Sequence, residues 1–88
     1  MRYLVDWTDD AVEGLAAAWN ALAGKMAIND ADAEISRLLA RDPFAVGAHA
    51  SEGLRQLDVR PLRAYYSVDI AKHQVEVLQI AFFEDPSA

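Results

Sequence analysis

The sequence predicts a small α+β domain in the order β-α-α-β-β-β, in which a helical hairpin packs on a small, mainly antiparallel sheet. Between residues 8 and 41 apolar side chains recur every three or four positions, as in amphipathic helices. Between residues 53 and 82 they largely alternate with polar ones, as in half-buried strands. Because the helices are segregated from the run of strands, we expect them to cover one face of the sheet. The 88 residues suit a single domain that spans residues 1–88.

The first strand is expected at residues 2–7, where side chains alternate in character. Its core face carries two aromatic residues and one β-branched residue, which are Tyr3, Val5 and Trp7. Thr8 then caps a helix, because the acids Asp9 and Asp10 complement the positive end of the helix dipole. This helix runs to about Gly24-Lys25, and its core stripe is Val12, Leu15, Ala16, Trp19, Leu22, Ala23 and Met26. Trp19 is therefore expected to pack in the core, within reach of Trp7.

A second helix is expected to begin at a cap formed by Asn29 or Asp30 and to end before Asp42-Pro43. Acidic residues occupy its first turns, and Arg37 and Arg41 lie near its end, as the helix dipole favours. The inner face consists of Ala31, Ile35, Leu38 and Leu39. Residues 43–51 show neither period and predict an irregular connection back to the sheet.

Three further strands are expected at residues 53–59, 62–69 and 74–82, as an antiparallel meander. In the middle strand the core face is Leu62, Ala64, Tyr66 and Val68, and the other face is Arg63, Tyr65, Ser67 and Asp69. In the last strand the apolar positions change parity after Val77, which indicates either a bulge near Val77 or a strand covered on both faces. One of the consecutive residues Phe82 and Phe83 must face away from the core, and residues 84–88 are expected to fray.

Composition excludes several classes of function. The chain has no cysteine, which rules out disulfides, thiolate metal sites and a cysteine nucleophile, and fits the reducing cytoplasm. The opening residues meet Asp6 too early for a signal peptide or a membrane span. The net charge of −6 opposes generic attraction to phosphate backbones. We expect no cofactor and no metal, since His49 and His73 lie far apart without partners at ligand spacing.

Three arginines, Arg55, Arg60 and Arg63, fall within nine residues and form the only basic concentration along the chain. Arg63 can stabilise a phosphate, or it can simply pair with Asp58 or Asp69. Tyr65 shares the Arg63 face of its strand, whereas Tyr66 is expected in the core. Glu52 is a general-base candidate near the arginines, with a solvated surface charge as the simpler interpretation.

Several segments of this chain match the pattern of a known family. They are the opening strand Tyr3–Trp7, the helix pair, the segment Leu39-Ala40-Arg41-Asp42-Pro43 and the segment Glu52-Gly53-Leu54-Arg55-Gln56-Leu57. The most telling is the run from Pro61 to Asp69, PLRAYYSVD, followed by VEVL at 75–78. Over nearly its whole length the chain resembles the RelE/ParE superfamily of small bacterial toxins from type II toxin-antitoxin modules. In this resemblance Arg63 stands at the family's strand arginine, and Tyr66 at the tyrosine three residues on.

The resemblance implies a cytoplasmic, growth-inhibiting toxin of the kind that stabilises plasmids. A cognate antitoxin would neutralise it by laying a helix or strand across the helical hairpin and sheet. RelE-like members bind the ribosomal A site and cut messenger RNA, whereas ParE-like members poison DNA gyrase. Arg55, Arg60 and Arg63 are then target-contact residues, and Arg63, Tyr65 and Glu52 are the catalytic candidates of a nuclease.

One departure from the family pattern lies at the end of the last strand. Catalytic relatives carry basic, histidine or tyrosine residues there, and this chain has Ala81-Phe82-Phe83-Glu84-Asp85. We therefore favour a ParE-like or attenuated toxin over an active nuclease. The alternative is a nontoxic, noncatalytic interaction module that keeps the toxin-like fold, as a homodimer or as a partner-binding subunit.

Overall fold

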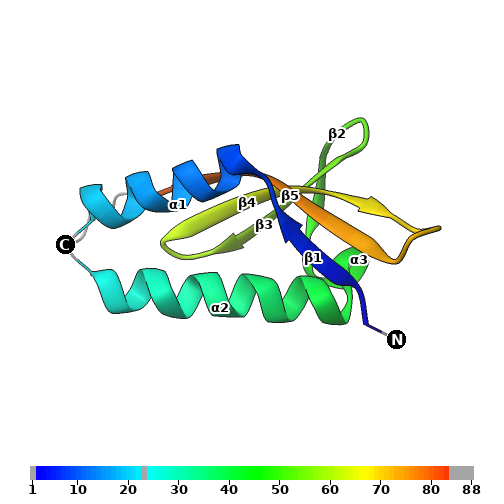
Figure 1. Ribbon diagram of the computed structural model, residues 1–88, viewed down its shortest axis with the longest axis horizontal. Coiled ribbons are helices and arrows are strands. Elements are labelled where there is room, and N and C mark those ends of the chain that lie inside the picture. The colour runs from blue at the N-terminus through cyan, green and yellow to red at the C-terminus, as the bar shows by residue number, and fades with distance from the viewer. Residues whose placement is uncertain (1, 23, 84–88) are drawn as a thin grey trace.

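The computed structural model describes residues 2–22 and 24–83 (Figure 1). Its elements are β1 (Leu4–Trp7), α1 (Asp9–Ala21), α2 (Lys25–Arg41), α3 (Pro43–Val46), β2 (Ala48–Ser51), β3 (Leu54–Val59), β4 (Leu62–Asp69) and β5 (Gln74–Phe82). The predicted α+β class is confirmed, and α3 and β2 are additions to the predicted order. The tail at residues 84–88 lies outside the described residues. None of the helices in the described ranges is long and apolar enough to cross a bilayer.

The five strands form one sheet in the order β1-β5-β4-β3-β2. Strands β3, β4 and β5 make the predicted antiparallel meander. Strand β2, which was not predicted, pairs antiparallel with β3, and β1 pairs parallel with β5. The helical hairpin of α1 and α2 covers one face of this sheet, and the largest buried strand residues on that face are Tyr66, Leu62, Val75 and Val77. We call the opposite face the outer face. It carries the alternate residues of β4, which are half-buried because no described element covers them.

Small residues seat α1 on the sheet. Ala11 and Ala18 are fully buried, and Gly14 lies between them on the same face of the helix. A Cβ atom on Gly14 would stand only 2.2 Å from the carbonyl oxygen of Ile80 in β5. The helix backbone can therefore approach the strand much more closely than large side chains would allow.

The predicted core stripe of α1 is only partly correct. Leu15 and Leu22 pack against the core as predicted, and Ala23 lies outside the described residues.

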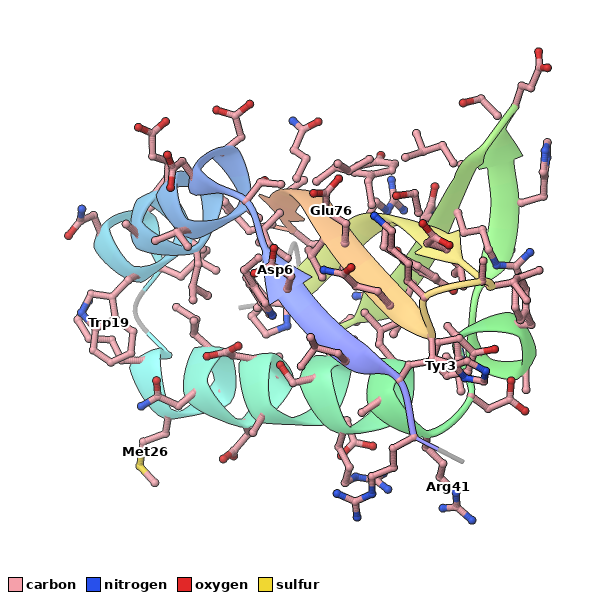
Figure 2. The ribbon with its side chains drawn as sticks, turned by 45° about the vertical axis from the view of Figure 1, so that its right-hand side comes forward. Tyr3, Asp6, Trp19, Met26, Arg41 and Glu76 are labelled. Atoms are coloured by element: carbon pink, nitrogen blue, oxygen red, sulfur yellow. The ribbon has the colours of Figure 1, made fainter. Side chains whose placement is uncertain are left out.

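The large residues of the predicted stripe are exposed, because α1 approaches the sheet closely. Val12 is 52% exposed, Trp19 is 37% exposed and Met26, at the start of α2, is 80% exposed. These large side chains flank the contact instead of filling it, because the small residues one position away occupy the sheet-facing side. Figure 2 shows Trp19 and Met26 at the end of the helical hairpin where α1 ends and α2 begins. Trp7, in contrast, packs partly buried against the core as predicted.

The two main helices also differ from their predicted bounds. Helix α1 ends at Ala21, where Leu22 turns extended and its N–H bonds to the Ala18 carbonyl oxygen, rather than near Gly24. Helix α2 begins at Lys25, a full turn before the predicted cap at Asn29 or Asp30. The added turn brings Ile28 into the core, and the predicted inner residues Ala31, Ile35 and Leu39 are buried with it.

The connection after α2 is more regular than predicted. Pro43 opens the short helix α3, and the Asp42 carboxylate accepts hydrogen bonds from the Phe44 and Ala45 amides at 3.3 and 3.2 Å. Strand β2 then pairs with β3 at the edge of the sheet. All four residues of β2 are exposed, so no alternation of apolar side chains marks this strand in the sequence.

A bulge in β5 explains the change of parity in its apolar residues. Tyr65 of β4 pairs with Gln79, and the next residue, Tyr66, pairs with Val77. Leu78 is thus the extra residue, one position beyond the predicted place near Val77. Of the two interpretations left open by the sequence, the bulge is correct.

Thr8 joins the start of α1 to this bulge. Its hydroxyl oxygen accepts a hydrogen bond from the Ala11 amide at 3.2 Å, as predicted for a helix cap. The same hydroxyl lies 3.1 Å from the Val77 carbonyl oxygen and 3.0 Å from that of Leu78, to which it can donate its proton. The Thr8 amide also donates to Val77 at 3.0 Å, so one residue fixes the helix on the sheet.

Candidate functional site

The candidate site lies on the outer face of the sheet. Because side chains alternate along β4, Arg63 and Tyr65 point away from the helices, while Tyr66 is fully buried on the helix side. The pairing of β3 with β4 sets Asp58 directly opposite Arg63. The predicted orientation of the two tyrosines is confirmed.

Arg63 is held by a two-pronged ion pair with Asp58. Its Nε donates to one carboxylate oxygen at 2.8 Å and its Nη2 to the other at 3.1 Å. This hydrogen bonding lowers the pKa of Asp58 below its usual range and raises the pKa of Arg63 above its own. Of the two carboxylates named from the sequence, Asp58 is therefore the partner. The Arg63 side chain keeps 31% of its surface exposed, so the guanidinium is still accessible.

Phe83 forms an aromatic platform beneath two arginines. The guanidinium of Arg63 lies 4.7 Å from the ring centroid, and that of Arg60 lies 5.5 Å from it. The Phe83 amide donates to the Pro61 carbonyl oxygen at 2.8 Å, which fixes the ring beside the β3–β4 turn. Phe82 packs against the core, so the predicted division between the two phenylalanines is confirmed.

Arg55 does not join this cluster. It pairs across the sheet with Tyr66 and therefore lies on the helix side, opposite to Arg63. Its Nη2 donates to the carbonyl oxygens of Phe44 and Gly47, at 3.0 Å each. Arg55 thus secures the segment around α3, and the fold brings together only Arg60 and Arg63 of the three predicted contact residues.

The buried hydroxyl of Tyr66 completes this tether. It donates to the Pro43 carbonyl oxygen at 2.6 Å and accepts from Arg55 Nε at 3.4 Å. Tyr66 therefore links the centre of the sheet to the start of α3, and its side chain is not available on the surface. Arg55 and Tyr66 therefore have a structural role, which is to hold the segment around α3 against the sheet.

The remaining predicted candidates lie away from Arg63. Glu52 is in the exposed β2–β3 turn, six residues before Asp58 and roughly 20 Å along an extended strand. His49 is exposed on the edge strand β2, opposite Arg55. His73 is in the β4–β5 turn at the other end of the sheet; it is half-buried, and its ring centroid is 5.1 Å from that of Tyr3. His73 therefore packs on a neighbouring ring and does not project freely into solvent.

These positions define what the outer-face site can do. It offers two guanidinium groups, an aromatic ring and the Tyr65 phenol, which suit contacts with an anionic or aromatic group of a partner. No histidine or free carboxylate stands beside Arg63 among residues 2–22 and 24–83 to transfer protons in the way a ribonuclease step requires. Within the same ranges no three His, Cys, Asp or Glu side chains gather as metal ligands.

A second feature is an apolar groove between the two long helices. It has a volume of about 320 Å³ and is lined by Val12, Leu15, Ala16, Trp19, Asn20, Ile28 and Asn29. The exposed side chains of Val12 and Trp19 form one wall. Sequence reasoning missed this groove because it assigned these residues to the core. The sequence signal that could have revealed the groove is the stripe of small residues Ala11, Gly14 and Ala18. It predicts that this side of α1 packs closely on the sheet, which leaves Val12 and Trp19 beside the contact.

The ion pair makes a prediction about pH. A lowered Asp58 pKa means that the pair stabilises the folded chain above the unfolded-state value of about 3.9, and that this contribution is lost as pH falls through the folded-state pKa. In Arg63→Gln we expect the Asp58 carboxyl carbon, followed by NMR, to titrate at a higher pH than in the wild-type chain. Arg60→Gln serves as the control, because Arg60 is the weakest contributor to the shift. Equal midpoints in wild type and Arg63→Gln would contradict the pairing.

Sequence comparisons with protein families and with curated proteins find no match. Comparison of the structure does find similar folds. A chain of the RelBE2 toxin-antitoxin complex from Mycobacterium tuberculosis superposes with a TM-score of 0.79 and 22% identity, covering 97% of this chain and 95% of that one. The chromosomal ParDE toxin-antitoxin system of P. aeruginosa gives a TM-score of 0.67 and 22% identity over 93% and 97%. The isolated E. coli RelE toxin gives 0.64 and 20% identity over 94% and 86%. The chain therefore has the fold of the RelE/ParE toxins.

Proposed function

We propose that this chain is the toxin component of a type II toxin-antitoxin pair. The observation that carries the proposal is the likeness of fold along almost the entire chain to RelBE2, ParDE and RelE, all described as toxins or as toxin-antitoxin structures. The absence of cysteine fits action in the cytoplasm.

We propose that the outer-face site contacts the toxin's macromolecular target. Arg63 and Arg60 on the Phe83 platform are accessible cations in a chain of net charge −6. A guanidinium that is already oriented by Asp58 loses less freedom when it meets a target group than a free side chain would. Because neither a histidine nor a free carboxylate stands beside Arg63 within residues 2–22 and 24–83, we favour a ParE-like contact with DNA gyrase over cleavage of messenger RNA on the ribosome.

The apolar groove between α1 and α2 suits the neutralising partner. Large exposed apolar side chains beside a groove are typical of surfaces that another chain covers. A short amphipathic helix would bury Val12 and Trp19 and place its polar side toward solvent. The partner we propose is a small antitoxin with such a segment, encoded beside this chain.

The test is growth of a bacterium in which the chain is expressed from a tight inducible promoter, with pulse-labelling of DNA and protein. We expect growth arrest with early loss of DNA synthesis. Early loss of protein synthesis would instead support a translational target and refute the gyrase assignment. Unimpaired growth with folded protein would refute the toxin proposal and favour a nontoxic interaction module.

The same growth assay tests whether the antitoxin binds the apolar groove between α1 and α2. Co-expression of the product of the adjacent reading frame is expected to restore growth in the wild-type chain. With Trp19→Glu, arrest is expected to persist despite co-expression, because a charge in the groove opposes burial of an apolar partner. Ala17→Glu, on an exposed position of the same helix outside the groove lining, is the matched control and is expected to remain neutralised. Equal neutralisation of both variants would place the partner elsewhere.

A further inference from the structure

A second basic cluster lies at the C-terminal end of α2, on a different part of the molecule. Arg2, Arg37 and Arg41 line a hollow of about 450 Å³, with Ala40 beside them. The sequence does not reveal this cluster, since Arg2 stands at the far end of the chain from the other two. All three arginines are exposed, and Figure 2 shows the Arg41 side chain extending from the end of the helix into solvent.

The fold holds the cluster together through the backbone. The Tyr3 amide donates to the Ala40 carbonyl oxygen at 2.8 Å, which fixes Arg2 beside the last turn of α2. The Tyr3 ring in turn packs on His73 of the β4–β5 turn. The hydrogen bond from the Tyr3 amide also gives a partner to the Ala40 carbonyl oxygen, one of the carbonyl groups that a helix end leaves without an intrahelical partner. The contacts of Tyr3 therefore hold the backbone of Arg2 beside the end of α2.

Only one of the three charges in this cluster is paired with an acid within residues 2–22 and 24–83. Arg37 donates from Nε and Nη2 to the two carboxylate oxygens of Glu34, which lowers the pKa of that carboxyl. In the described part of the chain neither Arg2 nor Arg41 has a carboxylate within ion-pair distance. The helix dipole accounts for basic residues in the last turn of α2, but it does not account for Arg2, which another segment supplies.

We propose that this hollow binds the carboxylates of a short acidic peptide segment from a partner protein. The forked geometry of guanidinium matches carboxylate oxygens, and Arg37 already binds Glu34 in this manner. Two unpaired arginines, Arg2 and Arg41, flank that pair and can receive further acids. The inference concerns only the chemistry of this hollow, and it does not depend on the chain being a toxin.

A nucleic acid fits this surface less well. Non-specific affinity for a phosphate backbone grows with the number of phosphates that are neutralised, and the hollow offers only three arginines, one of them engaged. A long polyanion would also run along a protein of net charge −6, where Asp30 and Asp32 lie farther up α2. A short segment with a few carboxylates can contact Arg2 and Arg41 without reaching Asp30 and Asp32.

The proposal is tested by NMR titration of the full chain with hexaglutamate at low ionic strength. We expect saturable shifts of the Ala40 and Arg41 amide resonances that weaken as salt is added. The double variant Arg2→Glu, Arg41→Glu is expected to weaken binding about five-fold or more, on the scale of two exposed ion pairs. The neutral double variant Arg2→Gln, Arg41→Gln should show a smaller loss of the same kind. Lys25→Glu, which reverses an exposed charge at the opposite end of α2, is the matched control and is expected to bind like the wild type.

Three results would overturn the proposal. The first is the absence of saturable shifts at the end of α2. The second is an equal loss of binding in Lys25→Glu, which would mean general charge attraction. The third is tighter binding of hexauridylate than of hexaglutamate through the same residues, which would make the surface one for nucleic acid. Loss of toxicity in cells plays no part in this test, so its failure and that of the proposed function are distinguishable.

Discussion

Gly14→Ala is expected to destabilise the chain by about 2 kcal/mol, although alanine is the better helix former. Alanine gains about 0.8–1.0 kcal/mol over glycine inside a helix. Here the added Cβ would lie 2.2 Å from the Ile80 carbonyl oxygen, an atom of the β5 backbone that cannot rotate away. Relief requires α1 to move off the sheet, which would loosen the buried Ala11 and Ala18 on either side. Overpacking of this kind costs about 1–3 kcal/mol or more, so the clash outweighs the propensity.

The measurement is thermal unfolding followed by circular dichroism. For a domain of this size about 2 kcal/mol lowers Tm by on the order of 10 °C. Gly24→Ala is the matched control, since a Cβ there would meet only the Ala27 Cβ, at an ordinary 3.8 Å. We expect Gly24→Ala to change Tm by a few degrees at most. A Gly14→Ala chain as stable as the wild type would mean that α1 sits farther from β5 than described.

The same contact shows where sequence reasoning about the fold failed. A stripe chosen for its largest apolar residues places Val12 and Trp19 in the core. Hydrophobicity alone cannot identify the sheet-facing side when a small-residue stripe such as Ala11, Gly14 and Ala18 occurs one position away. How closely α1 can approach the sheet depends on the backbones of both α1 and β5, so the sequence of the helix alone does not predict it. The predicted strands at residues 62–69 and 74–82, by contrast, match β4 and β5, because alternation there reflects a single buried face.

The candidate site was predicted only in part. The alternation of β4 places Arg63 and Tyr65 on one face, and proximity in a hairpin makes Asp58 a natural partner for Arg63. Arg55 and Arg63 are close in the sequence, but their side chains point to opposite faces of the sheet. The register between β3 and β4 decides this, because it sets Arg55 opposite Tyr66 and Asp58 opposite Arg63. The position of the Phe83 ring beneath two guanidinium groups depends on the direction that the backbone takes after β5. No pattern of neighbouring residues in the sequence predicts that direction.

In a bacterial host whose growth the wild-type chain inhibits, Arg63→Ala is expected to abolish the inhibition and to leave the chain folded. The exposed pair with Asp58 contributes about 0–1 kcal/mol to stability. The contact of the guanidinium with the Phe83 ring adds about 0.5–1 kcal/mol. A charged hydrogen-bonded contact at an interface costs about 2–5 kcal/mol when one partner is removed, which means at least a 30-fold weaker hold on the target. The loss should therefore appear in growth and hardly at all in Tm.

Two further substitutions separate a target contact from a structural support. Asp58→Asn removes the negative charge but keeps a side-chain oxygen that can accept from Arg63 Nε, and the guanidinium stays on the Phe83 ring, so we expect inhibition to persist. Arg55→Ala leaves the outer face intact but frees the carbonyl oxygens of Phe44 and Gly47, so its effect is expected on Tm. Colony counts after induction and Tm values of the purified chains provide both readouts. If Arg63→Ala inhibits growth as strongly as the wild type, Arg63 does not contact the target and the assignment of the outer face as the target surface fails.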